Sequence, residues 1–191
     1  MDKLNEAILF ATEAHKGQKR KMTGIPAILH SLEAAAIVAT LTSDEDVICA
    51  AVLHDVVEDT KYEIGDIEKQ FGARIAGLVG AETENKRFGL PPSATWKIRK
   101  EESLAHLRQV PDINVKYLWL GDKLSNIRSL YQAHLKYGDE MWKNFNERDK
   151  EKQKWYYESI VEILKSDFED VPAFWEYERL VNTIFKKGET K

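Results

Sequence analysis

The stretch "LHDVVEDT", residues 53–60, places one histidine and three carboxylates directly after the apolar run "VICAAVL". Residues four apart on a helix share a face, so His54 would stack beneath Glu58 and Asp55 beneath Asp59. An adjacent imidazole and carboxylate suit a divalent first-row cation such as Mn²⁺ or Fe²⁺. Glu58 and Asp59 would then lie beside the cation, where a carboxylate can hold and deprotonate a water.

The alternative interpretation is an acidic helix end that is exposed to solvent and has no site. Three carboxylates near a helix C-terminus oppose the macrodipole, which favours cations there. A bound cation would supply the missing positive charge. The stretch therefore favours a metal site over a solvated helix end.

Two residues elsewhere in the chain are candidates to complete such a site. His30 lies in the mostly apolar stretch "PAILHSLEAAA", where a lone histidine is more often a core residue with a satisfied hydrogen bond. Asp122 follows the apolar "YLWL" and needs a partner, because burying an unpaired carboxylate is costly. Lys123 would lie on a neighbouring face and is not expected to pair with it. One cation held by His30, His54, Asp55 and Asp122 would satisfy all four side chains.

The elements that must position these residues are predicted to be helices. Apolar residues recur at three- and four-residue spacings, and no stretch shows the alternation of a strand. We expect an all-α fold with about eight to ten helices and no significant sheet. The expected helices cover residues 3–15, 26–41, 44–58, 64–72, 73–83, 95–109, 113–136, 139–165 (with a break allowed) and 172–187.

The bulk composition excludes several classes of protein. The 191 residues are expected to form a single domain over 1–191. A net charge of −4 argues against binding nucleic acid through a basic surface. The only cysteine, Cys49, excludes an intrachain disulfide and a multi-cysteine zinc site. The chain lacks a signal-peptide layout and an apolar run long enough to span a membrane, so we expect a cytoplasmic protein without membrane partners. The sequence leaves open whether the chain forms a homo-oligomer.

Four stretches together resemble a known family. The order and spacing of "AHKGQKRKMTGIPAILHSLEAA", "AAVLHDVVEDT", "FGARIAGLVGAETENK" and "LGDKLSNIRSL" are similar to those in the hydrolase domains of Rel/Spo homologues. These domains belong to the HD superfamily of metal-dependent phosphohydrolases and degrade the alarmones ppGpp and pppGpp. The resemblance covers roughly residues 3–165. It implies an HD-domain helical bundle, a stand-alone small alarmone hydrolase and a guanine nucleotide as its small-molecule substrate.

The resemblance also implies roles for single residues. The ligands of one Mn²⁺ would be His30, His54, Asp55 and Asp122. The acidic pair that orients and activates the attacking water would be Glu58 and Asp59. The contacts to guanine, phosphates and nucleoside would be Arg20, Lys21 and Asn126. Arginine is planar and can stack on a purine as well as pair with phosphate, whereas lysine acts as a point charge.

Other stretches of the chain resemble the family less closely. Lys97, Arg99 and Lys100 are candidate phosphate contacts, of which Lys97 is retained as a substrate-binding residue; the alternative is an exposed helix face. The family commonly reads PYxxHP around its first histidine, whereas this chain has Ala27 and Ser31 there, a change that would reshape the rim of the pocket. The aromatic residues 155–157 would either close the pocket or, as their helical spacing favours, pack in the core.

The expected reaction is hydrolysis of the pyrophosphate on the ribose 3′ oxygen, which gives GDP or GTP and pyrophosphate. A first alternative is a phosphohydrolase of the HD type that acts on another nucleotide, such as a 5′-nucleotide, the 2′-phosphate of NADPH or a cyclic dinucleotide. A second alternative is a metal-bound module that binds the alarmone without turnover. Glu58 and Asp59 argue against the module, because a pure binding site for a polyanion gains nothing from extra carboxylates.

Overall fold

The structure is a computed structural model that describes residues 2–87 and 89–186. Apart from a lone bridge between Lys19 and Pro26, these residues contain no β-structure, and the predicted all-α fold is confirmed. No helix within these ranges is long and apolar enough to cross a membrane. The helices are α1 (Lys3–Ala14), α2 (Ile28–Val38), α3 (Glu45–Leu53), α4 (Val56–Asp59), α5 (Ile64–Phe71), α6 (Ala73–Glu82), α7 (Pro92–Gln109), α8 (Ile113–Tyr137), the 3₁₀ helix η1 (Gly138–Asn144), α9 (Lys150–Phe168) and α10 (Pro172–Phe185).

Local side-chain signals explain where several helices begin. Asp2, Asp112 and Asp149 precede α1, α8 and α9, and each carboxylate accepts a hydrogen bond from a backbone N–H of the first turn at 2.8–2.9 Å. Such caps satisfy donors that have no partner within the helix. Pro92 and Pro172 open α7 and α10, where the missing proline N–H costs nothing.

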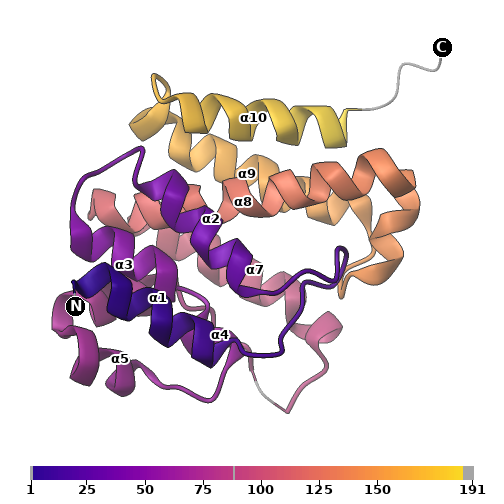
Figure 1. Ribbon diagram of the computed structural model, residues 1–191. Coiled ribbons are helices and arrows are strands. Elements are labelled where there is room, and N and C mark those ends of the chain that lie inside the picture. Colours follow the sequence, from indigo (N-terminus) through magenta and orange to yellow (C-terminus); the bar gives the residue numbers. More distant parts are fainter. Residues whose placement is uncertain (1, 88, 187–191) are drawn as a thin grey trace.

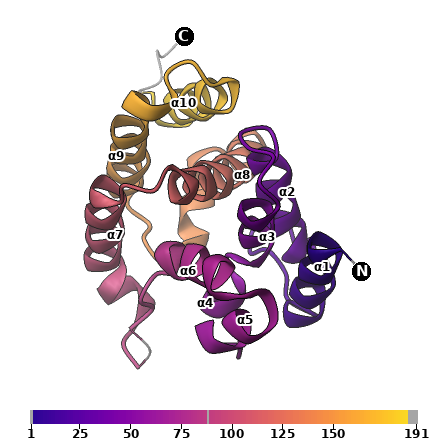
Figure 2. The same ribbon diagram turned by 90° about the vertical axis from the view of Figure 1, so that its left-hand side faces the viewer.

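The longest helix, α8, forms the centre of the bundle. It contacts α2, α3, α6 and α10, and its side chains Leu118, Leu120, Leu124 and Ile127 are buried. In the side view, α7 and α9 line one flank and α1, α2 and α3 the other, with α8 between them (Figures 1 and 2). Residues from distant parts of the sequence therefore meet along α8.

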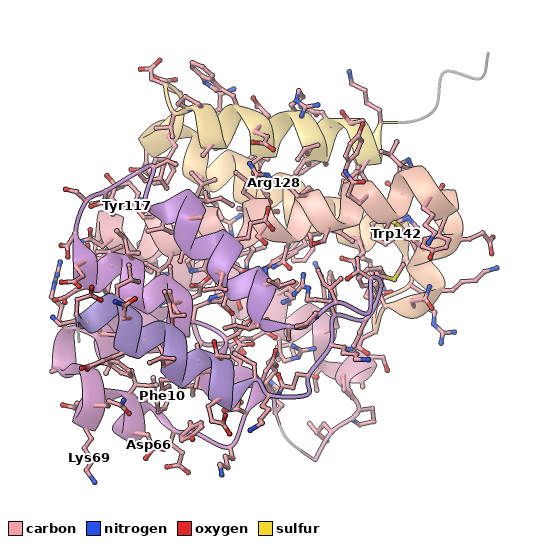
Figure 3. All side chains as sticks on the ribbon, in the orientation of Figure 1. Phe10, Asp66, Lys69, Tyr117, Arg128 and Trp142 are labelled. Atoms are coloured by element: carbon pink, nitrogen blue, oxygen red, sulfur yellow. The ribbon has the colours of Figure 1, made fainter. Side chains whose placement is uncertain are left out.

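Aromatic and charged side chains connect helices that are distant in the sequence. On α1, Phe10 contacts Tyr62 and Phe71 with ring centroids 4.7 and 5.5 Å apart. Trp142 of η1 stacks on Phe185 of α10 at 5.5 Å. Figure 3 labels Phe10, Trp142 and also Arg128 of α8, whose guanidinium binds carboxylates of both α2 and α10.

The predicted continuous helix over residues 44–58 is wrong. It is split into α3 and α4, and the chain turns at His54 and Asp55. The ring Nδ1 of His54 donates to the carbonyl oxygen of Ala51 at 2.8 Å, the acceptor that the Asp55 N–H would use in an unbroken helix. The stacking of His54 beneath Glu58 assumed an unbroken helix and does not carry over to this structure. The helix expected over 139–165 is likewise divided, into η1 and α9.

Candidate active site

Three predicted ligands from separate helices converge in the interior. His30 of α2, His54 at the end of α3 and Asp122 of α8 each offer a ligand atom, and these atoms lie within 4.8 Å of one another. His30 Nε2 is 2.9 Å and His54 Nε2 3.6 Å from Asp122 Oδ1. The fourth predicted ligand, Asp55, borders this cluster, with Oδ2 3.5 Å from His30 Nε2 and 3.3 Å from His54 Nε2.

Hydrogen bonds on the far side of each imidazole determine which ring nitrogen faces the cluster. His54 Nδ1 donates to the Ala51 carbonyl, which leaves Nε2 pointing inward. Ser125 Oγ donates its one proton to Glu33 Oε2 at 2.7 Å, so it accepts the hydrogen bond from His30 Nδ1 at 2.8 Å. Both rings therefore direct Nε2 at Asp122. Partners of this kind orient metal-binding histidines.

These residues fit a divalent cation. His54 Nε2 is buried and makes no hydrogen bond within the described residues. Burial alone lowers the pKa of His54, but the carboxylates of Asp55 and Asp122 outweigh this and raise it well above its usual value. A metal ion binds the neutral imidazole, so metal binding at this position would compete with protonation of His54. Two imidazole nitrogens with carboxylate oxygens form a donor set that suits first-row divalent metals.

Lys123 contradicts the expectation from helix geometry. Its ammonium bonds Asp122 Oδ2, although the two residues are adjacent on α8. The lysine side chain is long enough to bend toward Asp122, and its ammonium lies over the Trp119 ring, 4.7 Å from the ring centroid. Burial raises the pKa of Asp122, but Lys123 and the imidazoles outweigh it and hold that pKa well below the usual value. Asp122 is therefore an ionised carboxylate.

The predicted acidic pair is bridged by a lysine that the sequence analysis did not single out. Lys86 Nζ lies 2.7 Å from Glu58 Oε2 and 3.3 Å from Asp59 Oδ1. Glu58 Oε1 also accepts the backbone N–H of Glu84 at 2.5 Å. Burial raises the pKa of Glu58 against the opposing effect of Lys86. A raised carboxylate pKa suits a general base, because it moves toward the working pH.

Two cavities with shared lining residues lie beside the cluster. The larger, of about 540 Å³, is lined in part by Ala27 and Tyr157, and the smaller, of about 280 Å³, by the cluster itself and by Tyr156. Six residues line both cavities: Arg20, Lys21, Asp55, Asp59, Asn126 and Phe145. The predicted substrate contacts Arg20, Lys21 and Asn126 thus lie where the cavities join.

A chain of hydrogen bonds connects two of the predicted substrate contacts to the cluster. Arg20 donates to Asn126 Oδ1 at 2.7 Å, and Asn126 Nδ2 donates to Asp122 Oδ1 at 2.5 Å. Asn126 follows Asp122 by one helical turn, so this second contact could be foreseen from the spacing. The contact with Arg20, 106 positions away, could not.

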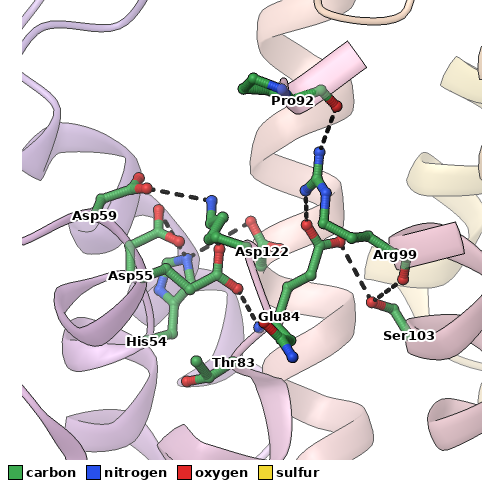
Figure 4. A network of polar contacts seen from close by, with 12 residues as sticks. His54, Asp55, Asp59, Thr83, Glu84, Pro92, Arg99, Ser103 and Asp122 are labelled. Carbon is green, nitrogen blue, oxygen red and sulfur yellow. Dashed lines mark hydrogen bonds and ion pairs between the residues drawn. The ribbon is translucent and has the colours of Figure 1, made fainter. Parts of the chain in front are cut away.

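The three cations predicted as phosphate contacts differ in position. Lys97 lies over the Trp155 ring at 3.0 Å, pairs with Glu101 at 3.3 Å, and is not among the described residues that line the cavities. Arg99 and Lys100 line the smaller cavity, and both bind Glu84. Figure 4 shows the contact of Arg99 with Glu84. The alternative of an exposed helix face is wrong for Arg99, whose residue is 6% exposed.

The stretch "GAETENK" was quoted only as part of the pattern, yet it supplies three side chains to the smaller cavity. These are Glu82, Glu84 and Lys86. In Figure 4, Glu84 lies between two groups of side chains, with Asp55 on one side and Arg99 and Ser103 on the other. Burial raises the pKa of Glu82 to about 8. The only signal in the sequence was the density of charges after an apolar helix.

Residues 7–147 match the family described as the HD domain. The chain belongs to the HD-domain family. The matched segment contains His30, His54, Asp55 and Asp122. This HD domain is similar to the guanosine-3′,5′-bis(diphosphate) 3′-pyrophosphohydrolase of Aquifex aeolicus (strain VF5), with 36% identity over 130 residues, 68% of this chain and 18% of that protein. The chain thus spans less than a fifth of the curated relatives it matches.

Two solved structures share the fold of this HD domain. The structure of lmo0812 from Listeria monocytogenes EGD-e is 35% identical, covers 83% of this chain and 99% of that one, and has a TM-score of 0.72. A metazoan SpoT orthologue, described as hydrolysing ppGpp and acting in starvation responses, is 24% identical. Its TM-score is 0.76, and the match covers 96% of both chains. The helical bundle predicted from the sequence is therefore a fold that both of these structures share.

Proposed function

We propose that this HD domain hydrolyses the 3′-pyrophosphate of ppGpp and pppGpp to give GDP or GTP and pyrophosphate, with Mn²⁺ as its cation. The Aquifex relative is named for this reaction, and the metazoan structure is described as hydrolysing ppGpp. The observation that carries the proposal is the position of the His30–His54–Asp122 cluster in the wall of the smaller cavity, which shares Arg20, Asp55 and Asn126 with the larger cavity.

The charges of the two cavities support a phosphorylated nucleotide as the substrate. The smaller cavity is lined by as many carboxylates as cations, and Lys86, Arg99, Lys100 and Lys123 are each paired with a carboxylate. Within the described residues, Arg20 and Lys21 line both cavities without a carboxylate partner, and a bound substrate could recruit the paired cations as well. Such a set can offset the charge of a pyrophosphate, the largest contribution a protein makes to phosphoryl transfer. The larger cavity has room for a nucleoside, and the Arg20 guanidinium on its wall can stack on a purine.

Each residue of the site has a proposed role. His30, His54, Asp55 and Asp122 would hold the cation. When bound, a divalent cation supplies Lewis-acid polarisation of a phosphoryl oxygen and a water of lowered pKa. A water oxygen bonds to the phosphorus on the ribose 3′ oxygen, and the bond from that phosphorus to the 3′ oxygen breaks. The acidic pair 58–59 takes the proton of the water, and the leaving 3′ oxygen receives it.

The test is incubation of the purified protein with Mn²⁺ and ppGpp, followed by separation of the products. We expect GDP and pyrophosphate in equal amounts, and no turnover when EDTA is present. A panel containing 5′-nucleotides, NADPH and cyclic dinucleotides tests the substrate class. Release of single phosphate from another nucleotide, with ppGpp left intact, would contradict the proposal. So would stoichiometric binding of ppGpp that is then recovered unchanged.

A further inference from the structure

Glu82 is a buried carboxylate that neither the sequence pattern nor the proposed reaction uses. It is the last residue of α6, and the residue is 9% exposed. Both of its carboxylate oxygens are buried without a hydrogen-bond partner among the described residues. Its position at a helix C-terminus also opposes the macrodipole. Burying an unpaired carboxylate in this way is unfavourable unless a nearby positive charge compensates it.

The surroundings of Glu82 show which charge is missing. Its side chain lines the smaller cavity, and the charged groups that act on it are His54, Asp122, Lys123 and Asp55. If a cation holds the imidazoles neutral and Glu82 ionised, the carboxylates of Glu82, Asp122 and Asp55 carry three negative charges, and the ammonium of Lys123 carries one positive charge. Two negative charges remain, which is the charge that one divalent cation neutralises.

We propose that Glu82 is a further residue of the cation site, where its carboxylate accepts hydrogen bonds from water molecules carried by the cation. The inference rests on the proposed cation at this site. Glu82 lies outside the group of ligand atoms that approach within 4.8 Å of one another, so contact through water fits better than direct ligation. Groups that hold the ligands or waters of a metal typically change its affinity by about 10- to 100-fold.

The test separates the effect on the cation from the effect on folding. Glu82→Gln keeps the shape of the side chain and removes its charge. Above pH 8, where Glu82 is ionised, we expect the metal-free variant to be at least as stable to urea as the wild type, because an unpaired buried charge is gone. Calorimetric titration with MnCl₂ should show an affinity about 10- to 100-fold lower than that of the wild type. Glu82→Met, of similar length and apolar, repeats the measurement if the glutamine variant does not fold.

Glu84→Gln is the matched control. Glu84 lines the same cavity, but its carboxylate is paired with Arg99 and Lys100. Its removal should destabilise the metal-free protein and leave the Mn²⁺ affinity nearly unchanged. An affinity of Glu82→Gln equal to that of the wild type would overturn the inference. If the wild type itself did not bind Mn²⁺, the cation site of the proposed function would fail, and the role of Glu82 with it.

Discussion

At the scale of single residues, the orientation of the imidazoles is the property on which the proposed cation binding depends. His30 and His54 each use Nδ1 for a hydrogen bond away from the cluster, so that Nε2 faces Asp122. For His54 the acceptor is a backbone carbonyl, which no substitution removes. For His30 it is the hydroxyl of Ser125, a fully buried side chain that is open to mutation.

Ser125→Ala tests this orientation. The variant leaves the Nδ1–H of His30 buried without an acceptor, which costs about 1–3 kcal/mol of stability. It also frees the ring to change its tautomer, so the Mn²⁺ affinity should fall by about 10-fold or more. Calorimetric titration measures the affinity. Ser103→Ala is the control, because Ser103 also lines the smaller cavity but bonds Arg99 and Glu84 instead. Equal losses of affinity in both variants would refute the specific role of Ser125.

The acidic pair offers a second test at this scale. Glu58→Gln combined with Asp59→Asn removes both candidate proton acceptors and keeps their shapes. We expect the Mn²⁺ affinity to persist and kcat for ppGpp to fall by about 10²- to 10⁴-fold, the usual contribution of general base catalysis. Steady-state kinetics at saturating Mn²⁺ measures the change. Near-normal turnover in the double variant would exclude the pair as activators of water.

At the scale of elements, the approach of α2 to α8 sets the distance between His30 and Asp122. The two helices touch at Gly121, which directly precedes Asp122. A Cβ atom at Gly121 would lie 2.6 Å from Val38 Cγ2 and 2.8 Å from the backbone oxygen of Ala34. The backbone oxygen cannot move without moving α2 itself. The glycine therefore permits the close contact of helices that brings an imidazole against a carboxylate.

Gly121→Ala should separate the two helices. We expect a loss of about 1–3 kcal/mol in the free energy of unfolding, the usual cost of overpacking, together with weaker binding of Mn²⁺. Urea denaturation and calorimetric titration measure the two effects. Gly77→Ala on α6 is the control, because a Cβ there meets nothing within 4 Å. That change should stabilise the helix by about 0.5–1 kcal/mol. A Gly121→Ala protein as stable as the wild type would contradict the tight contact.

At the scale of the whole molecule, the candidate ligands connect α2, the junction of α3 with α4, and α8. These segments are brought together only by the folded core, so a cation bound here would bind the folded state alone. Ligands of this kind stabilise a protein by mass action, by about 2.7 kcal/mol at a free concentration 100 times the dissociation constant. Global unfolding is therefore the property that Mn²⁺ should change most.

Cys49 on α3 offers a direct probe of that unfolding. Its residue is 0% exposed, and burial raises the pKa of its thiol to about 11. At pH 8 only about one thiol in a thousand would be ionised, so reaction with a disulfide reagent should be slow in the folded protein and fast in guanidinium chloride. The rate should rise with pH and fall when Mn²⁺ is added. Rapid reaction of the folded protein would show that α3 opens locally.

The sequence by itself determined the features that depend on neighbours within one or two helical turns. The helices over 3–15 and 113–136 were predicted nearly to their ends, because the apolar spacing and the caps that define them are local. The candidate ligands were also named in advance: His54 and Asp55 from their adjacency, and His30 and Asp122 from their places in apolar stretches. The family pattern then supported grouping the four, since no periodicity links positions so far apart.

Only the tertiary structure decided how the charges are paired. The turn at His54, the return of Lys123 to Asp122 and the bridge from Lys86 to the acidic pair all depart from simple helix geometry. The same holds for the orphaned carboxylate of Glu82. Each of these four features depends on which polar groups the packing buries and on which partners lie close enough to pair with them. Burial and contacts across tens of residues set these energies, and the spacing of residues along the chain does not encode them.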